Sequence, residues 1–426
     1  MKNDQGIADL LDQPDLWQQF LDYKIKRQHL KGEEEKQIRL YIEERRFEDN
    51  KKKIVEGAFP GEYPLKRIVN KEGTSKKRVV YSFGRDVSIT LKFIASQLYK
   101  YDDYFASNCY AFRRNTKAGD ALKRVLQNPG FSKKYCYKAD ISNYFNSINV
   151  ELLIEKLGFL KERDEVIYEL FRKILTEENV KENGCIRKEK HGAMAGLPIA
   201  PFFANVYLAD MDRYFLEKGI AYFRYSDDIL IFADTKEELE QYKGLLPEML
   251  KSCGLCINSS KESISKPGET WEFLGFSYNG GKLDLSQNTK RKIKAKIKRK
   301  AESLRRWQRK KNLPPDKAAI GFIRAMNRKF YGYEDNDDFT WNRWFFPYLT
   351  VDTGLREVDH YMQEYIRYII TGRHYKGNYR ITYDRMKEWG YRSLVHEYYQ
   401  FREGKNYGTI GKDNIGVRLS APEGIV

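Results

Sequence analysis

The stretch FRYSDDILIF, residues 223–232, contains the pattern that decides the fold. Two apolar runs, AYFRY (221–225) and ILIFA (229–233), are joined by a short polar turn that includes Asp227 and Asp228. Runs of β-branched and aromatic residues on either side of a short turn are typical of a β-hairpin. The sequence therefore predicts a hairpin with two adjacent carboxylates at its turn.

A third aspartate ends another apolar run. The segment YCYKADI (135–141) predicts a strand with Asp140 at its end. If this strand and the hairpin are neighbours in one sheet, Asp140, Asp227 and Asp228 meet at one edge, where carboxylates are costly unless a cation neutralises them. Oxygen ligands of this kind suit Mg²⁺, and two such ions would clamp the attacking and leaving oxygens of a phosphoryl transfer. The alternative is an ordinary surface turn.

The rest of the chain predicts a mixture of helices and strands. A basic hairpin is expected over 66–83, with its cationic centre from Lys71 to Lys77. Residues 269–278 are expected to complete a βαβ-like unit with an appended hairpin. Helices are expected over residues 14–53, 86–101, 149–178, 200–218 and 236–252, and over most of the last hundred residues.

The segment from Lys290 to Lys311 is the most basic part of the chain, since Glu302 is its one acid. Its apolar residues recur at helical spacing, so one stripe of the expected helix is apolar and the rest is positive. Asn312 and the two prolines after Leu313 end this helix. The residues of the stripe are Ile293, Ile297, Ala301 and Leu304.

Charge and composition point to a polyanionic partner. The 426 residues contain 77 Lys and Arg against 60 Asp and Glu, a net charge of +17, and aromatic residues make up 14%. A basic excess with many rings suits phosphate contacts and base stacking, and the alternative is a basic, solvated surface. The five cysteines are scattered, so we expect them to be reduced thiols in a cytoplasmic protein. No apolar run reaches about 18 residues, so we expect no membrane segment.

Six segments, in the right order from about 63 to 280, together resemble the motifs of reverse transcriptases. FRYSDDILIF resembles their YxDD motif, and YKADISNYFNSIN (137–149) resembles their first catalytic motif. The others are NCYAFRRNTKAGDAL (108–122), GAMAGLPIAPFFANVYLADMD (192–212), GLCINSSKESI (254–264) and EFLGF (272–276). The resemblance implies an α+β right-hand polymerase with fingers, palm and thumb, which makes DNA on an RNA template.

The resemblance also implies roles for single residues. Asp140, Asp227 and Asp228, with the backbone of Ile141, would hold two Mg²⁺ or Mn²⁺ ions, and Lys261 would protonate the leaving pyrophosphate. The residues expected around the deoxynucleoside triphosphate are Lys77, Arg78 and Arg113 for the phosphates, Phe145 as a steric gate against a 2′-hydroxyl, and Gly196 for close backbone approach.

The chain departs from the family pattern where Pro-Gln-Gly is usual, because it has Met194-Ala195-Gly196 there, and Ala200 replaces the usual serine. The missing glutamine amide bears on template choice and priming and leaves the metal site untouched.

Beyond the palm, the basic helix resembles the thumb, whose cations would follow the phosphates of a DNA/RNA hybrid. These are Lys290, Lys294, Lys298, Arg305, Arg306 and Arg309. The expected domains are a helical N-terminal extension (1–60), fingers and palm (61–285), thumb (286–335) and a helical C-terminal domain (336–426).

The C-terminal region, and GYRSLVHEYY (390–399) above all, resembles that of bacterial defence-associated reverse transcriptases of the Unknown-Group and abortive-infection lineage, related to group II intron and retron enzymes. This implies antiphage defence through cDNA copied from a partner noncoding RNA. Its rings and arginines would grip that RNA, or would form a compact cap on the thumb. They are Tyr375, Tyr379, Arg380, Tyr391 and Arg392.

Two other functions stay open at this point. One is a template-independent polymerase of the abortive-infection type, primed by a protein hydroxyl, which the missing glutamine favours. The other is an RNA-binding protein that keeps a polymerase fold without catalysis, which the intact Asp140, Asp227, Asp228 and Lys261 argue against. A homo-oligomer is compatible with either.

Overall fold

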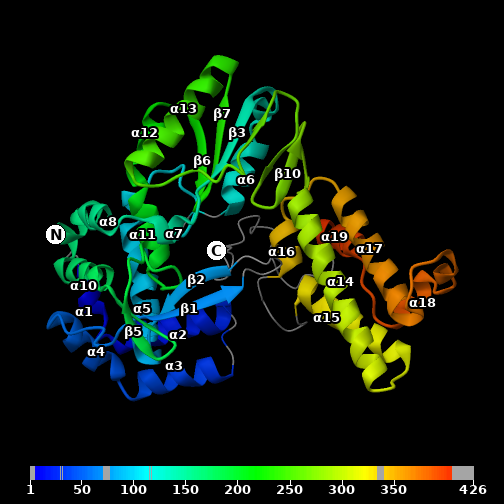
Figure 1. Ribbon diagram of the computed structural model, residues 1–426, viewed down its shortest axis with the longest axis horizontal. Helices are drawn as coiled ribbons and strands as arrows, with labels where there is room; N and C mark the ends of the chain where they lie inside the picture. Colours follow the sequence, from blue (N-terminus) through cyan, green and yellow to red (C-terminus); the bar gives the residue numbers. More distant parts are fainter. Residues whose placement is uncertain are drawn as a thin grey trace. The chain divides into compact units, whose positions relative to one another are not determined.

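The computed structural model describes residues 5–28, 30, 32–70, 77–114, 116, 118–332 and 340–404. The chain divides after Pro267 into two compact units (Figure 1). None of the helices in these described segments has an apolar stretch long enough to cross a membrane. All five cysteines are free thiols.

Helices make up most of the first unit, and α13 (Lys236–Ser252) begins and ends where the sequence predicts. The others are α1 (Ile7–Leu10), α2 (Pro14–Gln28), α3 (Glu33–Glu43), α4 (Arg46–Val55), α5 (Arg85–Gln97), α6 (Ala118–Leu126), α7 (Tyr144–Ser147), α8 (Val150–Lys156), α9 (Gly158–Arg163), α10 (Glu165–Thr176), α11 (Ala200–Tyr207) and α12 (Ala209–Glu217), with the 3₁₀ helices η1 (Leu98–Tyr104) and η2 (Pro129–Lys133).

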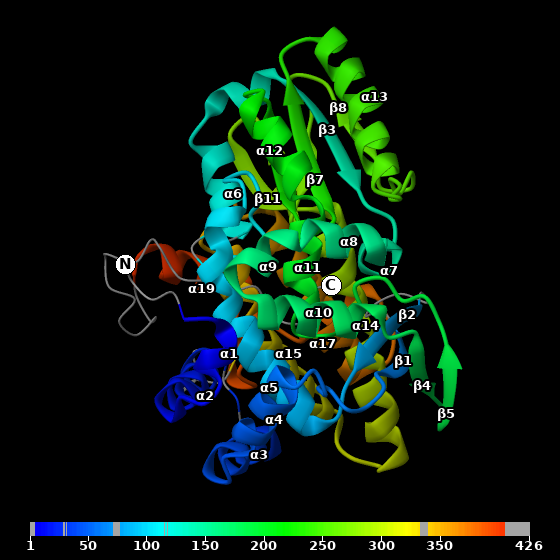
Figure 2. The same cartoon turned by 90° about the vertical axis from the view of Figure 1, so that its left-hand side faces the viewer.

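Two four-stranded sheets complete this unit (Figure 2), and the mixture confirms the predicted α+β class. The first has the order β6-β7-β3-β8, with α13 packed on β3 and β7 and α12 on β6. Its strands are β3 (Tyr135–Asp140), β6 (Ala221–Tyr225), β7 (Asp228–Ala233) and β8 (Ser263–Ser265). The second has the order β2-β1-β4-β5, from β1 (Leu65–Asn70), β2 (Lys77–Ser82), β4 (Asn179–Glu182) and β5 (Cys185–Lys188).

The prediction of one helix over 14–53 is wrong, because this segment forms α2, α3 and α4. Gly32 adopts φ +64° before α3, and Arg45 adopts φ +51° between α3 and α4. Left-handed backbone at either position ends a helix. The breaks allow Trp17 of α2 to stack on Phe93 of α5 with ring centroids 4.0 Å apart, so the N-terminal helices share the core of the first unit.

The helices predicted over 149–178 are α8, α9 and α10. The single helix predicted over 200–218 is wrong, because it forms α11 and α12, which part at Leu208, and one pair of strands is missing from the prediction. Gly184 lies in the turn between the unpredicted strands β4 and β5, where it adopts φ +85°. The predicted basic hairpin is β1 and β2, while its centre over 71–76 lies outside the described residues.

The second unit begins with a three-stranded antiparallel sheet of order β11-β10-β9. Residues 269–278 therefore belong to a separate sheet, and the prediction that they complete a βαβ-like unit is wrong. The strands are β9 (Trp271–Phe273), β10 (Phe276–Asn279) and β11 (Lys282–Leu285), followed by α14 (Gln287–Lys310), α15 (Pro315–Tyr331), α16 (Trp341–Phe345), α17 (Thr353–Thr371), η3 (Lys376–Arg380), α18 (Tyr383–Glu388) and α19 (Leu394–Arg402).

Helices α14, α15 and α17 pack against one another and form the core of the second unit. Ile293, Ile297 and Ala301 of the predicted apolar stripe are buried. The polar residue Asp359 of α17 is also buried and accepts hydrogen bonds from the amides of Leu394 and Val395 at the start of α19. This carboxylate satisfies amides that the first turn of a helix leaves without partners.

Candidate active site

The register of β3 and β7 brings the three aspartates to one end of their sheet. Asp140 lies directly opposite Asp228, and the amide of Ile141 donates to the carbonyl oxygen of Asp227 at 3.0 Å. Residues opposite each other in an antiparallel pair have Cα atoms roughly 4.5–5.5 Å apart. The two acidic segments, distant in the sequence, are therefore neighbours in space.

The turn that carries Asp227 is tight. Ser226 and Asp227 form the two-residue loop between β6 and β7, and Ser226 adopts φ +59°. Hairpin loops of this length require left-handed backbone, usually from glycine or asparagine. The hydroxyl oxygen of Ser226 is buried without a hydrogen-bond partner. The turn is thus held in its conformation by contacts from outside it.

Burial and neighbouring charge disfavour the ionised form of Asp227. Burial is the largest cause, and together with the charges of Asp228 and Asp140 it raises the pKa of Asp227 to about 6, while Lys261 opposes the rise. A cluster that disfavours its own negative charge favours any cation that binds to it. Carboxylate oxygens are also the donors that Mg²⁺ prefers, so these residues fit a divalent cation by charge and by ligand type.

Lys261 supplies a positive charge to this cluster. Its Nζ lies 2.5 Å from Oδ2 of Asp140, and Nδ2 of Asn258 lies 3.4 Å from Oδ1. The loop is fixed because the amide of Asn258 donates to the carbonyl oxygen of Asp140. Among the residues that the structure describes, no three His, Cys, Asp or Glu side chains are gathered as ligands of one ion. With Lys261 on Asp140, the aspartates are close in the sheet but are not arranged as a closed metal site.

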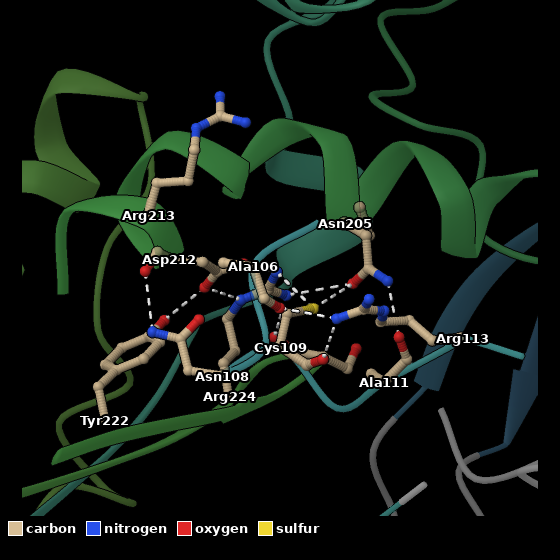
Figure 3. A network of polar contacts seen from close by, with 12 residues as sticks. Ala106, Asn108, Cys109, Ala111, Arg113, Asn205, Asp212, Arg213, Tyr222 and Arg224 are labelled. Atoms are coloured by element: carbon tan, nitrogen blue, oxygen red, sulfur yellow. Dashed lines mark hydrogen bonds and ion pairs between the residues drawn. The ribbon is translucent and has the colours of Figure 1, made fainter. Parts of the chain in front are cut away.

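A buried ion pair contacts the backbone of the β6–β7 turn, and Figure 3 shows its two side chains, Arg224 and Asp212. Arg224 of β6 donates from Nε and Nη2 to the two carboxylate oxygens of Asp212 at 2.8 and 2.5 Å, and both side chains are fully buried. Tyr222 donates to the same carboxylate at 3.0 Å. Nη1 of Arg224 also reaches the carbonyl oxygen of Ser226 at 3.3 Å. The pair therefore connects α12 to the loop that carries Asp227.

The same guanidinium reaches a third segment. Nη2 of Arg224 lies 3.1 Å from Sγ of Cys109, and Asn205 of α11 donates to the carbonyl oxygen of Ala111 (Figure 3). Burial alone would lower the pKa of Arg224, but the charge and hydrogen bonds of Asp212, together with Cys109 and Tyr144, outweigh it and raise that pKa well above its usual value. Burial raises the pKa of the Cys109 thiol to about 12. The arginine is thus permanently charged beside a neutral thiol.

The sequence prediction missed this network. A charged residue inside the apolar run AYFRY was a signal that Arg224 needs a buried partner, but nothing in the sequence pairs it with Asp212 rather than another acid. A buried arginine is stable only with a carboxylate in good geometry.

A backbone hydrogen bond links Phe145 to the segment that contains Gly196. Phe145 is buried on α7 with its ring centroid 6.5 Å from that of Phe112. Its carbonyl oxygen accepts from the amide of Ala193, and a Cβ on Gly192 would lie 2.4 Å from that oxygen. The structure gives a reason for Gly196 that the sequence did not supply. At φ +104°, a Cβ there would lie 2.9 Å from the carbonyl oxygen of Tyr81 in β2.

The residues expected to bind the triphosphate differ in their surroundings. Lys77 is exposed at the start of β2, with Arg78 beside it. Arg113 is different, because its guanidinium donates to the carbonyl oxygens of Asp102, Ala106 and Cys109. These bonds fix the loop before it, and its expected phosphate contact stays a prediction without support from this arrangement.

The six cations expected on the thumb fall into two rows of α14. Three of them contact α17: Lys290 and Lys294 pair with Glu357 at 2.7 and 2.6 Å, and Arg305 donates to the carbonyl oxygen of Tyr368 at 2.9 Å. The hydrogen bonds from both lysines lower the pKa of Glu357. The other three of the six are exposed. They are Lys298, Arg306 and Arg309.

The C-terminal residues expected to grip RNA divide in the same way. Tyr391 is buried and donates to Asp359 at 2.8 Å, while Arg392 pairs with Glu397 at 2.6 Å. Tyr391 joins the start of α19 to α17, whereas the ion pair of Arg392 and Glu397 lies within the α19 segment. Tyr375 and Tyr379 are exposed, and Arg380 is exposed beside them.

Comparison with known proteins agrees with this geometry. Residues 69–278 match the family described as "Reverse transcriptase (RNA-dependent DNA polymerase)". Similar curated proteins are the Retron Ec83 reverse transcriptase of Escherichia coli, 27% identical over 40% of this chain and 57% of that protein, and the Retron Ec86 reverse transcriptase, 24% identical over 41% and 52%. The chain therefore spans about half the length of these relatives.

Among solved structures, apo telomerase of Candida tropicalis, truncated from the C-terminal domain, is similar with a TM-score of 0.42 and 14% identity over 53% of this chain and 55% of that one. Telomerase of Candida albicans with a fragment of telomeric RNA has a TM-score of 0.40 and 12% identity over 80% and 66%.

Proposed function

We propose that this chain, whose residues 69–278 form a reverse transcriptase domain, is an RNA-directed DNA polymerase that copies a partner noncoding RNA. The observation that carries the proposal is the register of the central sheet. It places Asp140 opposite Asp228, with Asp227 in the adjoining turn, so that three carboxylates meet where the apolar strands end. Three carboxylates at one end of a sheet repel one another unless a cation neutralises them, and phosphoryl transfer uses metal ions held in this way.

In the proposed reaction, the 3′-hydroxyl of a growing DNA strand attacks the α-phosphate of a deoxynucleoside triphosphate. A new bond joins the 3′-oxygen to phosphorus, and the bond to pyrophosphate breaks. Divalent cations held by Asp140, Asp227 and Asp228 would neutralise the charge that develops on the phosphate oxygens. Lys261, already at hydrogen-bond distance from Asp140, would move from this carboxylate to the pyrophosphate and give it a proton.

The side chains around the aspartates would select and hold the nucleotide. Lys77 and Arg78 would bind the triphosphate by charge. Phe145 would exclude a ribonucleotide because its ring fills the volume that a 2′-hydroxyl needs. The buried position of Phe145, five residues after Asp140 and fixed through its backbone to Ala193, supports a rigid wall at this place.

The partner RNA and the biological role belong to the same proposal. Similarity to two retron reverse transcriptases supports a noncoding RNA as template. The resemblance of the C-terminal region to defence-associated enzymes supports antiphage defence in a bacterial cytoplasm. Exposed Tyr375, Tyr379 and Arg380 are the C-terminal side chains left to contact that RNA.

The test is extension of a DNA primer on an RNA template by purified protein with Mg²⁺ and deoxynucleotides. The wild type should extend the primer, and Asp227→Asn/Asp228→Asn should lose at least about 10³-fold in rate, because metal ions stabilise the transition state by several kcal/mol. Asp234→Asn is the matched control, since this carboxylate follows the other end of β7, where it pairs with Lys134. Equal, negligible activity in wild type and double variant would leave an RNA-binding protein without catalysis.

Sequencing of the product separates the two polymerase functions. DNA that mirrors the supplied RNA supports templated synthesis. DNA of unrelated sequence, covalently attached to the protein, supports the protein-primed alternative, which Ala195 in place of the usual glutamine favours. Sequencing the RNA that copurifies with the protein then identifies the template.

A further inference from the structure

The segment from Gly192 to Gly196 has an unusual backbone. Gly192, Met194 and Gly196 adopt φ of +58°, +51° and +104°. Left-handed backbone is disfavoured for a residue with a side chain, such as Met194, so contacts from the surroundings have to maintain it. Every residue from His191 to Ala195 is buried. The position of this backbone is therefore set by the contacts that enclose it.

The ring of His191 supplies two of these contacts. Its Nε2 lies 2.5 Å from the carbonyl oxygen of Glu177, just after α10, and its Nδ1 lies 3.2 Å from the carbonyl oxygen of Gly192. The side chain is 3% exposed. A neutral imidazole donates one hydrogen bond and an imidazolium donates two, so the ring donates to at least one of these oxygens in either form. His191 thus joins the end of α10 to the start of the left-handed segment.

The same ring packs against Tyr81 of β2. The two ring centroids are 5.7 Å apart and the planes meet at 66°. Tyr81 is itself fixed twice, because its amide donates to the carbonyl oxygen of Ala195 and its hydroxyl donates to Glu189, both at 2.7 Å. Lys66 of β1 pairs with the same glutamate. The histidine is therefore packed between a fixed strand residue and the left-handed segment.

The backbone of this segment lies directly on the backbone of Phe145. The amide of Ala193 donates to the carbonyl oxygen of Phe145 at 2.8 Å. A Cβ on Gly192 would lie 2.4 Å from that oxygen and 2.8 Å from the carbonyl oxygen of Asn146. No side chain can fit between the two backbones at this point. Because packed interiors transmit strain, a displacement of residues 192–193 would move Phe145 as well.

We infer that His191 is a positioning residue for sugar selection, which holds residues 192–193 against the backbone of Phe145 and so fixes the place of the Phe145 ring. This inference rests on the proposed function, in which that ring excludes a 2′-hydroxyl. His191 acts through Phe145, since its own ring is buried and both of its nitrogens face backbone oxygens. A misplacement of about 1 Å can change a rate about 10²-fold, so a small shift of the ring is enough to admit a ribonucleotide.

The experiment compares two ways of removing buried polar contacts from the first unit. His191→Leu removes both polar contacts of the imidazole. Asn50→Leu is the matched control, because Asn50 is buried and donates to Tyr41 and Thr90, away from this segment. Single-turnover primer extension with dGTP and with GTP gives the maximal rate and the apparent dissociation constant of each nucleotide. Thermal denaturation measures the loss of stability in each variant.

His191→Leu should lower the preference for dGTP over GTP by about 5- to 20-fold through better use of GTP, while the rate with dGTP falls less than about 3-fold. Asn50→Leu should lower the melting temperature and leave the preference as in the wild type. His191→Gln keeps an N–H donor for the carbonyl oxygen of Glu177 and should restore most of the preference.

A double variant tests whether His191 acts through Phe145. Phe145→Ala removes the ring outright and should show the lowest preference for dGTP. His191→Leu/Phe145→Ala should then show the same preference as Phe145→Ala alone, because no ring is left to position. Two independent effects would multiply instead.

An unchanged preference in His191→Leu, or effects of the two single variants that multiply, overturns the inference. If His191→Leu does not fold, His191→Asn takes its place, because the shorter side chain loses the contact with Glu177 and should lower the preference in the same direction. Failure of the polymerase proposal looks different, because the wild type would then incorporate neither dGTP nor GTP. A wild type that uses both nucleotides equally well would leave polymerisation intact and overturn the inference.

Discussion

Two ion pairs flank the same turn and differ in almost every respect. Arg224 and Asp212 are both fully buried and joined by two hydrogen bonds, whereas Lys261 keeps 45% of its side chain exposed and meets Asp140 through one. The first pair fixes the backbone behind the aspartates. The second can separate without exposing a buried cation. The Arg224–Asp212 pair is thus a fixed structural contact, whereas the Lys261–Asp140 pair can break and re-form.

The largest expected effect comes from breaking the buried pair on one side. Arg224→Met leaves the Asp212 carboxylate without a cation in a water-free site, which costs about 3–5 kcal/mol of folding free energy. Asp212→Leu should cost a similar amount because it leaves the guanidinium charged. Urea denaturation followed by circular dichroism measures both.

The double variant Arg224→Met/Asp212→Leu separates stability from positioning. Removing both charges should recover most of the lost stability, since a buried ion pair adds little over apolar residues of similar volume. Primer extension should stay low, because Ser226 still loses the hydrogen bond from Arg224 to its carbonyl oxygen. Full recovery of both stability and rate would show that the pair does not position the turn.

The second-largest expected effect concerns Asp227, whose carboxylate belongs to neither ion pair. The pKa of Asp227 is about 6 in the folded protein, against about 3.9 for an unfolded chain. Between these values the folded state binds more protons, so stability falls as pH rises from about 4 to about 6 and stays lower above. The loss is at most about 3 kcal/mol.

Asp227→Asn should therefore stabilise the protein in EDTA at pH 7.5, by up to about 3 kcal/mol, and the gain should vanish near pH 4. Adding Mg²⁺ should raise the melting temperature of the wild type more than that of the variant. Melting curves at four pH values with and without Mg²⁺ provide the comparison. A gain that is constant with pH would assign the effect to packing instead of charge.

Breaking the exposed pair should do less to stability. Lys261→Gln should lower the free energy of unfolding by about 1–3 kcal/mol, because the lysine is half in water but its partner Asp140 is buried. Its rate of nucleotide incorporation should fall about 10²-fold with little change in KM, as expected for loss of a proton donor. Single-turnover extension measures the rate, and a stability loss as large as that of Arg224→Met would contradict the contrast.

Local sequence patterns predicted the parts of this site that depend on neighbours in the chain. The β6–β7 hairpin, the end of β3 at Asp140 and helix α13 follow from apolar periodicity and turn residues, which act within a few positions. Gly32 and Arg45 broke a helix whose charged residues alone favoured continuity. The positive φ at both positions separates the helices, and Trp17 of α2 stacks on Phe93 of α5, a contact between distant residues that no local pattern records.

The parts of the site that local patterns did not predict depend on contacts between residues distant in the sequence. Cationic residues of α14 look alike in the sequence, yet Glu357 on α17 takes Lys290 and Lys294. Gly196 was expected to face a substrate, and the structure sets it against Tyr81. In each case the residue type was informative about chemistry, while its neighbour was set by tertiary contacts between elements.

The contrast between a fixed and an available cation recurs on α14, where the expected effects are smallest. Lys294 lies 2.6 Å from Glu357 and 5.3 Å from the ring of Tyr361, whereas Arg306 is exposed one helical face away. Lys294→Gln should lower the stability of the protein by about 0.5–1 kcal/mol and leave nucleic-acid affinity nearly unchanged. Arg306→Gln should do the reverse, weakening binding of a DNA/RNA hybrid about 2- to 5-fold and lowering the salt slope by about 0.9.

Parallel melting and filter-binding series at several salt concentrations compare the two variants. If Lys294→Gln also lowered the salt slope, both rows of α14 would contact phosphates, and the pairing with Glu357 would be exchangeable like that of Lys261 with Asp140.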